Sequence, residues 1–255
     1  MRWVIIALLV LTAGALAQDG ELTEVGIDEH LGQHVPLDLT FQDEDGRTVR
    51  LGDLLDKPTI LTLVYYRCPG ICTPLLSGVV DVLEKVDLEP GKDYQVLTIS
   101  FDPTEGPDLA ERKKMNFMKA FHEPFPEDAW RFMTGDSAAV AAITDAIGFR
   151  YKPQGKDFLH PGVLTVLSDQ GKIARYLYGI TFLPFDVKMA LMEAAEGRTG
   201  PTVRRVLLYC FSYDPEGKTY VFNILKVVGT LMMVFAALFV AWLVITTRRA
   251  RRREA

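Results

Sequence analysis

The sequence is poor in cysteine and histidine, because its 255 residues include only 3 cysteines and 4 histidines. So few cysteines exclude a small scaffold that is held together by many disulfides. The 20 glycines and 14 prolines follow no repeat, which excludes a collagen-like chain. Hydrophobic residues make up 49% of the chain, too many for an intrinsically disordered protein. We therefore expect a folded protein with a hydrophobic core.

The motifs of several enzyme classes are also missing. The sequence has no glycine-rich phosphate loop, no G-x-S-x-G nucleophile elbow and no zinc-protease H-E-x-x-H helix. Seven of the 28 basic residues and one of the 33 acidic residues lie outside residues 18–220, which leaves 21 basic and 32 acidic residues and a formal net charge of −11 in that part. An acidic surface argues against a nucleic-acid partner.

Both ends of the chain carry apolar segments. Residues 1–17 combine Arg2, an apolar run and Ala15-Leu16-Ala17, which is typical of a signal peptide cleaved before Gln18. Residues 227–245 carry no charge and would span about 28 Å as a helix, and five arginines follow within residues 246–255. We expect a transmembrane helix there, with an arginine-rich cytoplasmic tail and the preceding domain on the periplasmic side of the inner membrane.

Between these ends, residues 18–31 read as an N-terminal segment, residues 32–196 as one α/β domain and residues 197–226 as a juxtamembrane segment. A β-hairpin is expected at the start of the domain, with strands at residues 35–39 and 48–51. The later strands are expected at residues 59–65, 94–101, 130–133, 163–167 and 173–178. The helices are expected at residues 75–86, 108–121, 136–147 and 184–195. A thioredoxin-like fold fits this order of elements.

Two cysteines lie at a junction where reactive cysteines occur in that fold. Cys68 and Cys72 are four residues apart, between a predicted buried strand and a predicted helix. If the junction is helical, the two side chains share one face, at a spacing that suits a shared metal ion. A small adjustment would instead allow a structural disulfide, which is the simplest reading of such a pair in an exported protein.

His160 lies directly before the strand at residues 163–167. In a thioredoxin-like fold this turn faces the cysteine loop and usually carries a cis-proline, the place that Pro161 holds. Two thiolates and one imidazole form a soft ligand set that suits copper. Structural zinc would require a fourth ligand, and the sequence offers no convincing one.

The residues around both cysteines resemble a known family. The segment Tyr66-Arg67-Cys68-Pro69-Gly70-Ile71-Cys72-Thr73-Pro74 is similar to the C-P-x-[VI]-C-P loop of the Sco/SenC proteins. Ser100-Phe101-Asp102-Pro103 resembles their S-V-D-P segment, and residues 130–135 resemble their W-x-F-L-T-G segment. His160 falls where the family has a metal-binding histidine. The resemblance covers residues 32–196.

This resemblance implies a thioredoxin-like copper chaperone that assists assembly of the dinuclear copper site, CuA, in subunit II of cytochrome c oxidase. It implies Cys68 and Cys72 as redox thiols and, together with His160, as ligands of Cu(I) or Cu(II). A thioredoxin-like reductant would be a second partner. Asp102 is either an outer residue of the site or a turn residue. The sequence departs from the family pattern in having Pro161 after the histidine and Thr104-Glu105-Gly106-Pro107 in place of the usual D-T-P.

Two other functions remain open at this point. A metal-free thiol–disulfide oxidoreductase or thiol peroxidase would use Cys68 for attack and Cys72 to resolve the product. A docking domain would keep the same pair as a structural disulfide. Cys210 is the odd cysteine and is expected to be a free or structural thiol.

Overall fold

The computed structural model describes residues 25–200, 211–214 and 219–222, together with residues 232, 235, 236, 239 and 242. The chain divides into two units, Met1–Gly200 and Pro201–Ala255. All three predicted ligands lie in the first unit. The predicted signal peptide, Cys210 and the arginine-rich tail lie outside the described residues.

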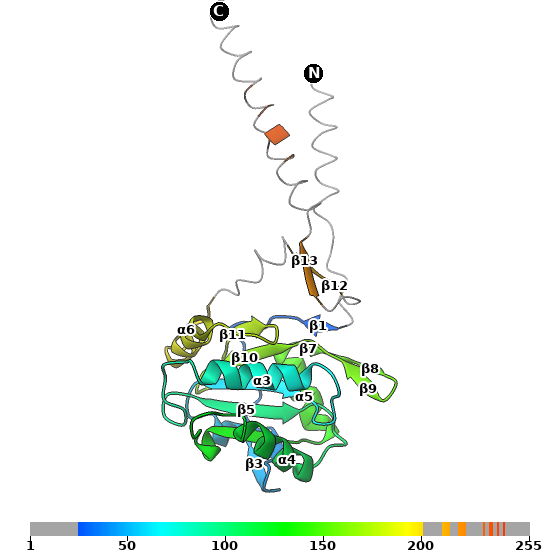
Figure 1. Ribbon diagram of the computed structural model, residues 1–255, viewed down its shortest axis with the longest axis vertical. Coiled ribbons are helices and arrows are strands. Elements are labelled where there is room, and N and C mark those ends of the chain that lie inside the picture. Colours follow the sequence, from blue (N-terminus) through cyan, green and yellow to red (C-terminus); the bar gives the residue numbers. More distant parts are fainter. Residues whose placement is uncertain are drawn as a thin grey trace, which may run out of the picture. The chain divides into compact units, whose positions relative to one another are not determined.

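A five-stranded sheet with the order β11-β10-β4-β5-β6 forms the centre of the first unit (Figure 1). The strands β4 (Thr59–Val64), β5 (Gln95–Ser100) and β6 (Trp130–Met133) are parallel. Strand β10 (Val163–Leu167) runs antiparallel to β4, and β11 (Ile173–Tyr178) runs antiparallel to β10. All residues of β4, β5 and β10 are buried, as expected for strands with both faces covered.

Two adjacent residues of β11 show how helices cover the two faces. Arg175 forms an ion pair with Glu193 of the last helix at 2.8 Å, whereas the Tyr176 hydroxyl donates to the backbone oxygen of Ile147 at 2.8 Å. Successive side chains of a strand point to opposite faces, so α5 and α6 lie on opposite faces of the sheet. Helix α3 contacts both α4 and α6 and shares their face (Figure 1). The four helices are α3 (Cys72–Leu83), α4 (Pro107–Met118), α5 (Ser137–Ile147) and α6 (Pro184–Ala195).

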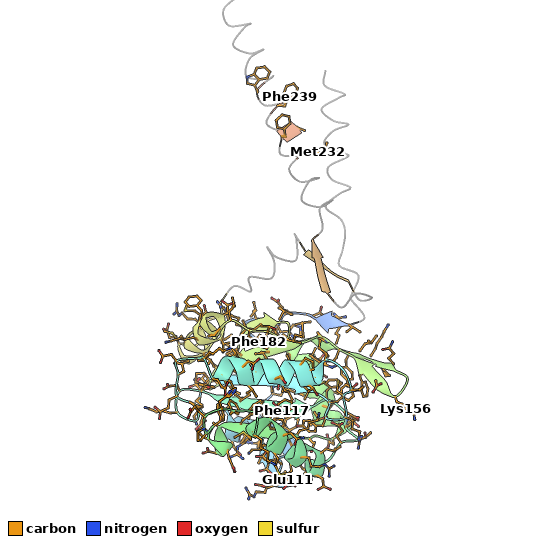
Figure 2. All side chains as sticks on the ribbon, viewed as in Figure 1. Glu111, Phe117, Lys156, Phe182, Met232 and Phe239 are labelled. Carbon is orange, nitrogen blue, oxygen red and sulfur yellow. The ribbon has the colours of Figure 1, made fainter. Side chains whose placement is uncertain are left out.

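Short elements complete the domain. The pairs of strands are β1 (Gly26–Ile27) with β7 (Phe149–Arg150), β2 (Thr40–Gln42) with β3 (Thr48–Arg50), and β8 (Lys152–Gln154) with β9 (Asp157–Leu159). The short helices are α2 (Leu51–Leu54) and the 3-10 helix η1 (Glu127–Ala129). The β8–β9 hairpin extends away from the central sheet, with Lys156 near its free end (Figure 2). Among the described residues of the second unit, β12 (Phe211–Asp214) pairs antiparallel with β13 (Thr219–Phe222), which the sequence did not predict.

The thioredoxin-like α/β arrangement agrees with the sequence prediction, and the strands at 130–133, 163–167 and 173–178 and the helix at 184–195 have the predicted bounds. The N-terminal hairpin is present, but its first strand is Thr40–Gln42 rather than residues 35–39. Val35 instead donates its backbone N–H to Gly171, and the Leu37 and Leu39 carbonyl oxygens accept from the start of α2. The backbone of residues 35–39 therefore forms these hydrogen bonds outside the β2–β3 hairpin.

The prediction of a C-terminal transmembrane helix is contradicted. Among the residues that the structure describes, no helix is long and apolar enough to cross a membrane. Within residues 25–200 the longest helices have 12 residues, whereas a membrane span needs about 20. An apolar run alone does not make a membrane helix, because its residues must also form one long helix. Most of 227–245 lies outside the described residues, and the fold class is corrected to the α/β domain without that helix.

Candidate metal-binding and redox site

The register of the sheet brings the histidine to the cysteines. Strand β10 pairs antiparallel with β4, and Leu164 lies opposite Thr62. The residues just before β10 therefore lie beside the residues just after β4. His160 comes from the first of these segments and Cys68 from the second. Two positions that are 92 residues apart in sequence meet at the same end of the sheet.

Both cysteines occupy the turn that joins β4 to α3. The Cys68 backbone N–H donates to the Tyr65 carbonyl oxygen at 3.2 Å, so Cys68 precedes the helix. Cys72 is the first residue of α3, three residues earlier than the predicted start. Cys68 is 8% exposed and Cys72 is 1% exposed, and both are free thiols. The expected junction is present, but only the second cysteine is helical.

The three predicted ligands form one cluster. The ligand atoms of Cys68, Cys72 and His160 all lie within 4.8 Å of one another, and all three residues are buried. The Nε2 atom of His160 is 3.2 Å from the Cys72 sulfur. The other ring nitrogen, Nδ1, is 3.1 Å from the Pro161 carbonyl oxygen. Because a carbonyl oxygen only accepts, Nδ1 carries the proton in neutral His160 and Nε2 presents its lone pair to the sulfur atoms.

Pro161 holds the place where a thioredoxin-like fold usually carries a cis-proline, but its peptide bond is trans. No peptide bond is cis among the described residues, and the His160–Pro161 bond is one of these. The trans bond nevertheless leaves the Pro161 carbonyl within hydrogen-bond distance of the imidazole. Pro161 therefore contributes its carbonyl oxygen, which orients the histidine.

The two thiols differ in acidity although they are neighbours. The hydrogen bond from Cys72 holds the pKa of Cys68 far below its ordinary value, and the backbone N–H groups of Cys72 and Gly70 lower it further. Burial raises the pKa of Cys72, and the adjacent Cys68 sulfur raises it further. The metal-free site thus contains one thiolate, Cys68, beside one thiol, Cys72. Thiolate is the form that attacks disulfides and ligates metal ions.

Aromatic rings form the wall behind the histidine. The ring centroids of Tyr65, Phe101 and Phe149 lie 5.8, 5.2 and 6.1 Å from that of His160. Burial raises the pKa of the Tyr65 phenol, and a hydrogen bond with Cys68 raises it further. Tyr65 therefore stays protonated beside the thiolate. The sequence analysis placed Tyr65 at the end of a strand and missed this contact; its position three residues before Cys68 was the available signal.

Asp102 is placed as a turn residue near the cysteine loop. Its Oδ1 atom accepts from the backbone N–H and the hydroxyl of Thr104, at 2.9 and 2.7 Å. Its Oδ2 atom is 3.8 Å from the Arg67 guanidinium. Asp102 thus folds its own loop and reaches the cysteine segment through Arg67.

Comparison with known proteins finds a match that contains these site residues. The family model described as SCO1/SenC matches residues 28–183. The chain belongs to the SCO1/SenC family. The matched segment includes both cysteines, His160 and all five strands of the central sheet. The sequence resemblance to this family is confirmed.

Individual family members and solved structures agree with this membership. The SCO1 protein homolog of Bacillus subtilis (strain 168) is 27% identical over 153 residues, which cover 58% of this chain and 75% of that protein. A structure from Aquifex aeolicus VF5, described as a candidate electron transfer protein, is 31% identical, covers 65% of this chain and 95% of that chain, and has a TM-score of 0.60. A copper-bound ScoI structure from Arabidopsis thaliana is 19% identical, covers 62% and 96% of the two chains and has a TM-score of 0.50, which supports the fold.

Proposed function

We propose that this chain binds one copper ion through Cys68, Cys72 and His160 and serves in the assembly of the CuA site of cytochrome c oxidase. The observation that carries the proposal is the convergence of two sulfur atoms and one imidazole nitrogen within 4.8 Å. Membership of the SCO1/SenC family supports it, and so does the likeness to the copper-bound ScoI structure from Arabidopsis. Copper is cargo in this proposal: the chain receives it and passes it on.

The chemistry of the donor set fits copper. Thiolate sulfur is a soft ligand that selects Cu(I), and imidazole binds copper in both oxidation states. Structural zinc prefers four protein ligands, and the cluster supplies three among the described residues. The Cys68 thiolate is ready to bind, whereas Cys72 must release its proton when the metal enters. Copper binding by the reduced protein should therefore release protons.

The decisive experiment is a Cu(I) titration of the reduced full chain against a chromogenic competing chelator, without oxygen. One tightly bound copper per chain is expected, and Cys68→Ser, Cys72→Ser and His160→Ala should each weaken it. Matched controls are Cys210→Ser, which also removes one thiol, and His122→Ala, which removes an exposed imidazole bound to Glu84. Binding that survives all three site substitutions would overturn the proposal.

The cellular role is tested separately from binding. We infer that the recipient is the CuA domain of oxidase subunit II. Cells that lack this chain should assemble little CuA at limiting copper, and the wild-type chain should restore assembly. A Cys68→Ser/Cys72→Ser double variant should not restore it. Full assembly with the double variant would exclude copper delivery through these thiols.

We further propose that the domain acts outside the cytoplasm. The support is the segment 1–17, with its positive charge, apolar run and A-x-A site. N-terminal sequencing of the protein from cells should find Gln18 as the first residue. An intact Met1 in protein that otherwise functions would contradict this.

The unequal acidity of the two thiols favours thiol–disulfide exchange as a second candidate function. The Cys68 thiolate would attack one sulfur of a partner disulfide, and the other partner sulfur would leave as a thiolate. Cys72, after losing its proton, would attack Cys68 and release the second partner sulfur. The partner gains two electrons, and this chain is left with a Cys68–Cys72 disulfide, which a thioredoxin-like reductant would reduce. Rapid turnover of a disulfide by copper-free protein would favour this function over copper delivery.

A further inference from the structure

A buried carboxylate lies behind the cysteine loop. Glu105 is 5% exposed and lies in the turn between β5 and α4. The Tyr66 backbone N–H donates to its Oε2 atom at 2.6 Å, and the Arg67 backbone N–H donates to its Oε1 atom at 2.7 Å. The Ser100 hydroxyl donates to Oε2 at 2.7 Å. Both carboxylate oxygens are thus used, and each holds a backbone N–H close to Cys68.

The local backbone shows why a carboxylate is needed at this point. Strand β4 ends at Val64, and its carbonyl oxygen accepts from the backbone N–H of Phe101, the residue that follows β5. The pairing of β4 with β5 ends at Val64 and Ser100, so the N–H groups of Tyr66 and Arg67 lie beyond the ladder. A buried N–H group needs a partner, and the side chain of Glu105 supplies one for each. Glu105 thereby continues the pairing for two more residues.

Further contacts tie the same two loops together. The Arg67 guanidinium donates to the Thr104 hydroxyl at 3.1 Å, and Thr104 in turn bonds Asp102. The Ser100 hydroxyl accepts from the Asp102 backbone N–H at 3.2 Å while it donates to Glu105. The loop that carries Glu105 is therefore folded on itself. A rigid loop can fix the position of the segment it holds.

We propose that Glu105 is a positioning residue for the copper site. It holds the backbone one and two residues before Cys68, and this backbone sets the distance of the Cys68 sulfur from Cys72 and His160. The inference rests on the proposed function, because the reason for fixing Cys68 is the shared metal ion. It adds a residue that acts through the loop and not as a ligand. Substitutions of such supporting residues typically weaken metal binding by about 10–100-fold.

Three variants of the full chain test the proposal. Glu105→Gln keeps the size of the side chain but replaces one acceptor oxygen with a donor, so one backbone N–H loses its partner. Glu105→Asp keeps the charge and withdraws the carboxylate by one methylene. Glu44→Gln is the matched control, because Glu44 is also a buried carboxylate that accepts a backbone N–H, from Phe132 of β6 at 3.0 Å. Its other bond goes to Lys114 of α4, and neither bond involves the backbone of residues 65–68.

Two measurements are made on each variant: the Cu(I) affinity, by chelator competition, and hydrogen exchange of the peptide that contains residues 65–68 in the reduced, metal-free chain. For Glu105→Gln we expect exchange at least about tenfold faster in this peptide and Cu(I) affinity about 10–100-fold lower. Glu44→Gln should leave both values at the wild-type level, even where it lowers the free energy of unfolding as much. Should Glu105→Gln fail to fold, Glu105→Asp should still show faster exchange and weaker binding.

Wild-type exchange and affinity in a folded Glu105 variant would overturn the inference, and so would an equal loss of affinity in Glu44→Gln. Failure of the proposed function gives a different result. If the wild-type chain binds no copper, the copper proposal fails, whereas the exchange of residues 65–68 still reports whether Glu105 holds the loop.

Discussion

The Nε2 atom of His160 lies 3.2 Å from the Cys72 sulfur, while the opposite ring nitrogen lies 3.1 Å from the Pro161 carbonyl oxygen. The imidazole is therefore oriented by the backbone on one side and aimed at the thiols on the other. The nitrogen donor of the cluster therefore faces Cys72, the first residue of α3. The role of His160 can consequently be separated from that of the sulfur atoms.

We predict that His160→Ala reduces Cu(II) affinity more than Cu(I) affinity. Two thiolates still suit the soft Cu(I) ion, whereas Cu(II) prefers nitrogen and oxygen ligands. Equilibrium titration with each ion is expected to show a loss for Cu(I) and a larger loss for Cu(II). His122→Ala should change neither value. Equal losses for both ions would contradict the assigned role of His160.

A second prediction concerns the pH dependence of Cys68 reactivity. Because the hydrogen bond from Cys72 lowers the pKa of Cys68, this sulfur stays a thiolate as the pH falls well below the ordinary thiol range. The alkylation rate of Cys68 by iodoacetamide in reduced, metal-free protein should therefore be nearly constant between about pH 5 and pH 8. For an ordinary thiol with a pKa of about 8.5, the rate would fall roughly tenfold for each unit by which the pH is lowered over this range.

Two substitutions of Cys72 separate its hydrogen bond from its sulfur. Cys72→Ala removes the donor, so the alkylation rate of Cys68 should begin to fall at a higher pH. Cys72→Ser keeps a hydroxyl donor and should preserve most of the flat profile. Identical profiles for the two variants would show that another group sets the acidity of Cys68.

The sequence predicted the cluster because its three members sit at positions that the fold defines. Cys68 and Cys72 follow the first parallel strand, and His160 precedes the strand that pairs with it, so knowledge of the strand order was enough to bring them together. The role of Glu105 could not be predicted in this way. Its bonds join it to residues 38 and 39 positions earlier through one buried side chain, and no periodicity records such a contact.

Local chemistry explains the errors in the element boundaries. Helix α3 begins at Cys72, ahead of Pro74, because a proline is tolerated in the first turn of a helix. The sequence analysis placed the start after this proline. The β8–β9 hairpin was missed because Pro153 lies within its first strand and the segment is polar, which argues against a strand.

A third prediction concerns the polar contact at the centre of the sheet. Thr98 of β5 is fully buried, and its hydroxyl accepts from the Thr62 hydroxyl and from the Trp130 indole N–H, both at 2.8 Å. Thr98→Val would leave the indole N–H without its acceptor, so we expect a loss of about 1–3 kcal/mol in the free energy of unfolding. Urea denaturation measures this loss. Thr62→Val leaves the bond from Trp130 to Thr98 in place and should lower the free energy of unfolding less. A larger loss for Thr62→Val than for Thr98→Val would contradict the role of Thr98 as the acceptor for Trp130.

The last prediction compares two glycines with similar backbone angles. Gly148 ends α5 with φ of +69°, and Gly155 lies in the β8–β9 turn with φ of +67°. A Cβ atom at Gly148 would collide with the Asp28 carbonyl oxygen, whereas a Cβ at Gly155 meets nothing within 4 Å. Gly155→Ala should therefore cost only the left-handed backbone strain, about 1–2 kcal/mol.

Gly148→Ala adds a backbone collision to the same strain, and the Asp28 N–H bond to the Gly148 carbonyl at 2.9 Å holds the two segments together. We expect an additional loss of about 1–3 kcal/mol in the free energy of unfolding, measured by urea denaturation of both variants. Because β1 and β7 pair at this point, proteolysis should also become faster near residues 26–28 in Gly148→Ala. Equal stability of the two variants would show that the β1 segment moves aside without cost, and that its pairing with β7 contributes little to the fold.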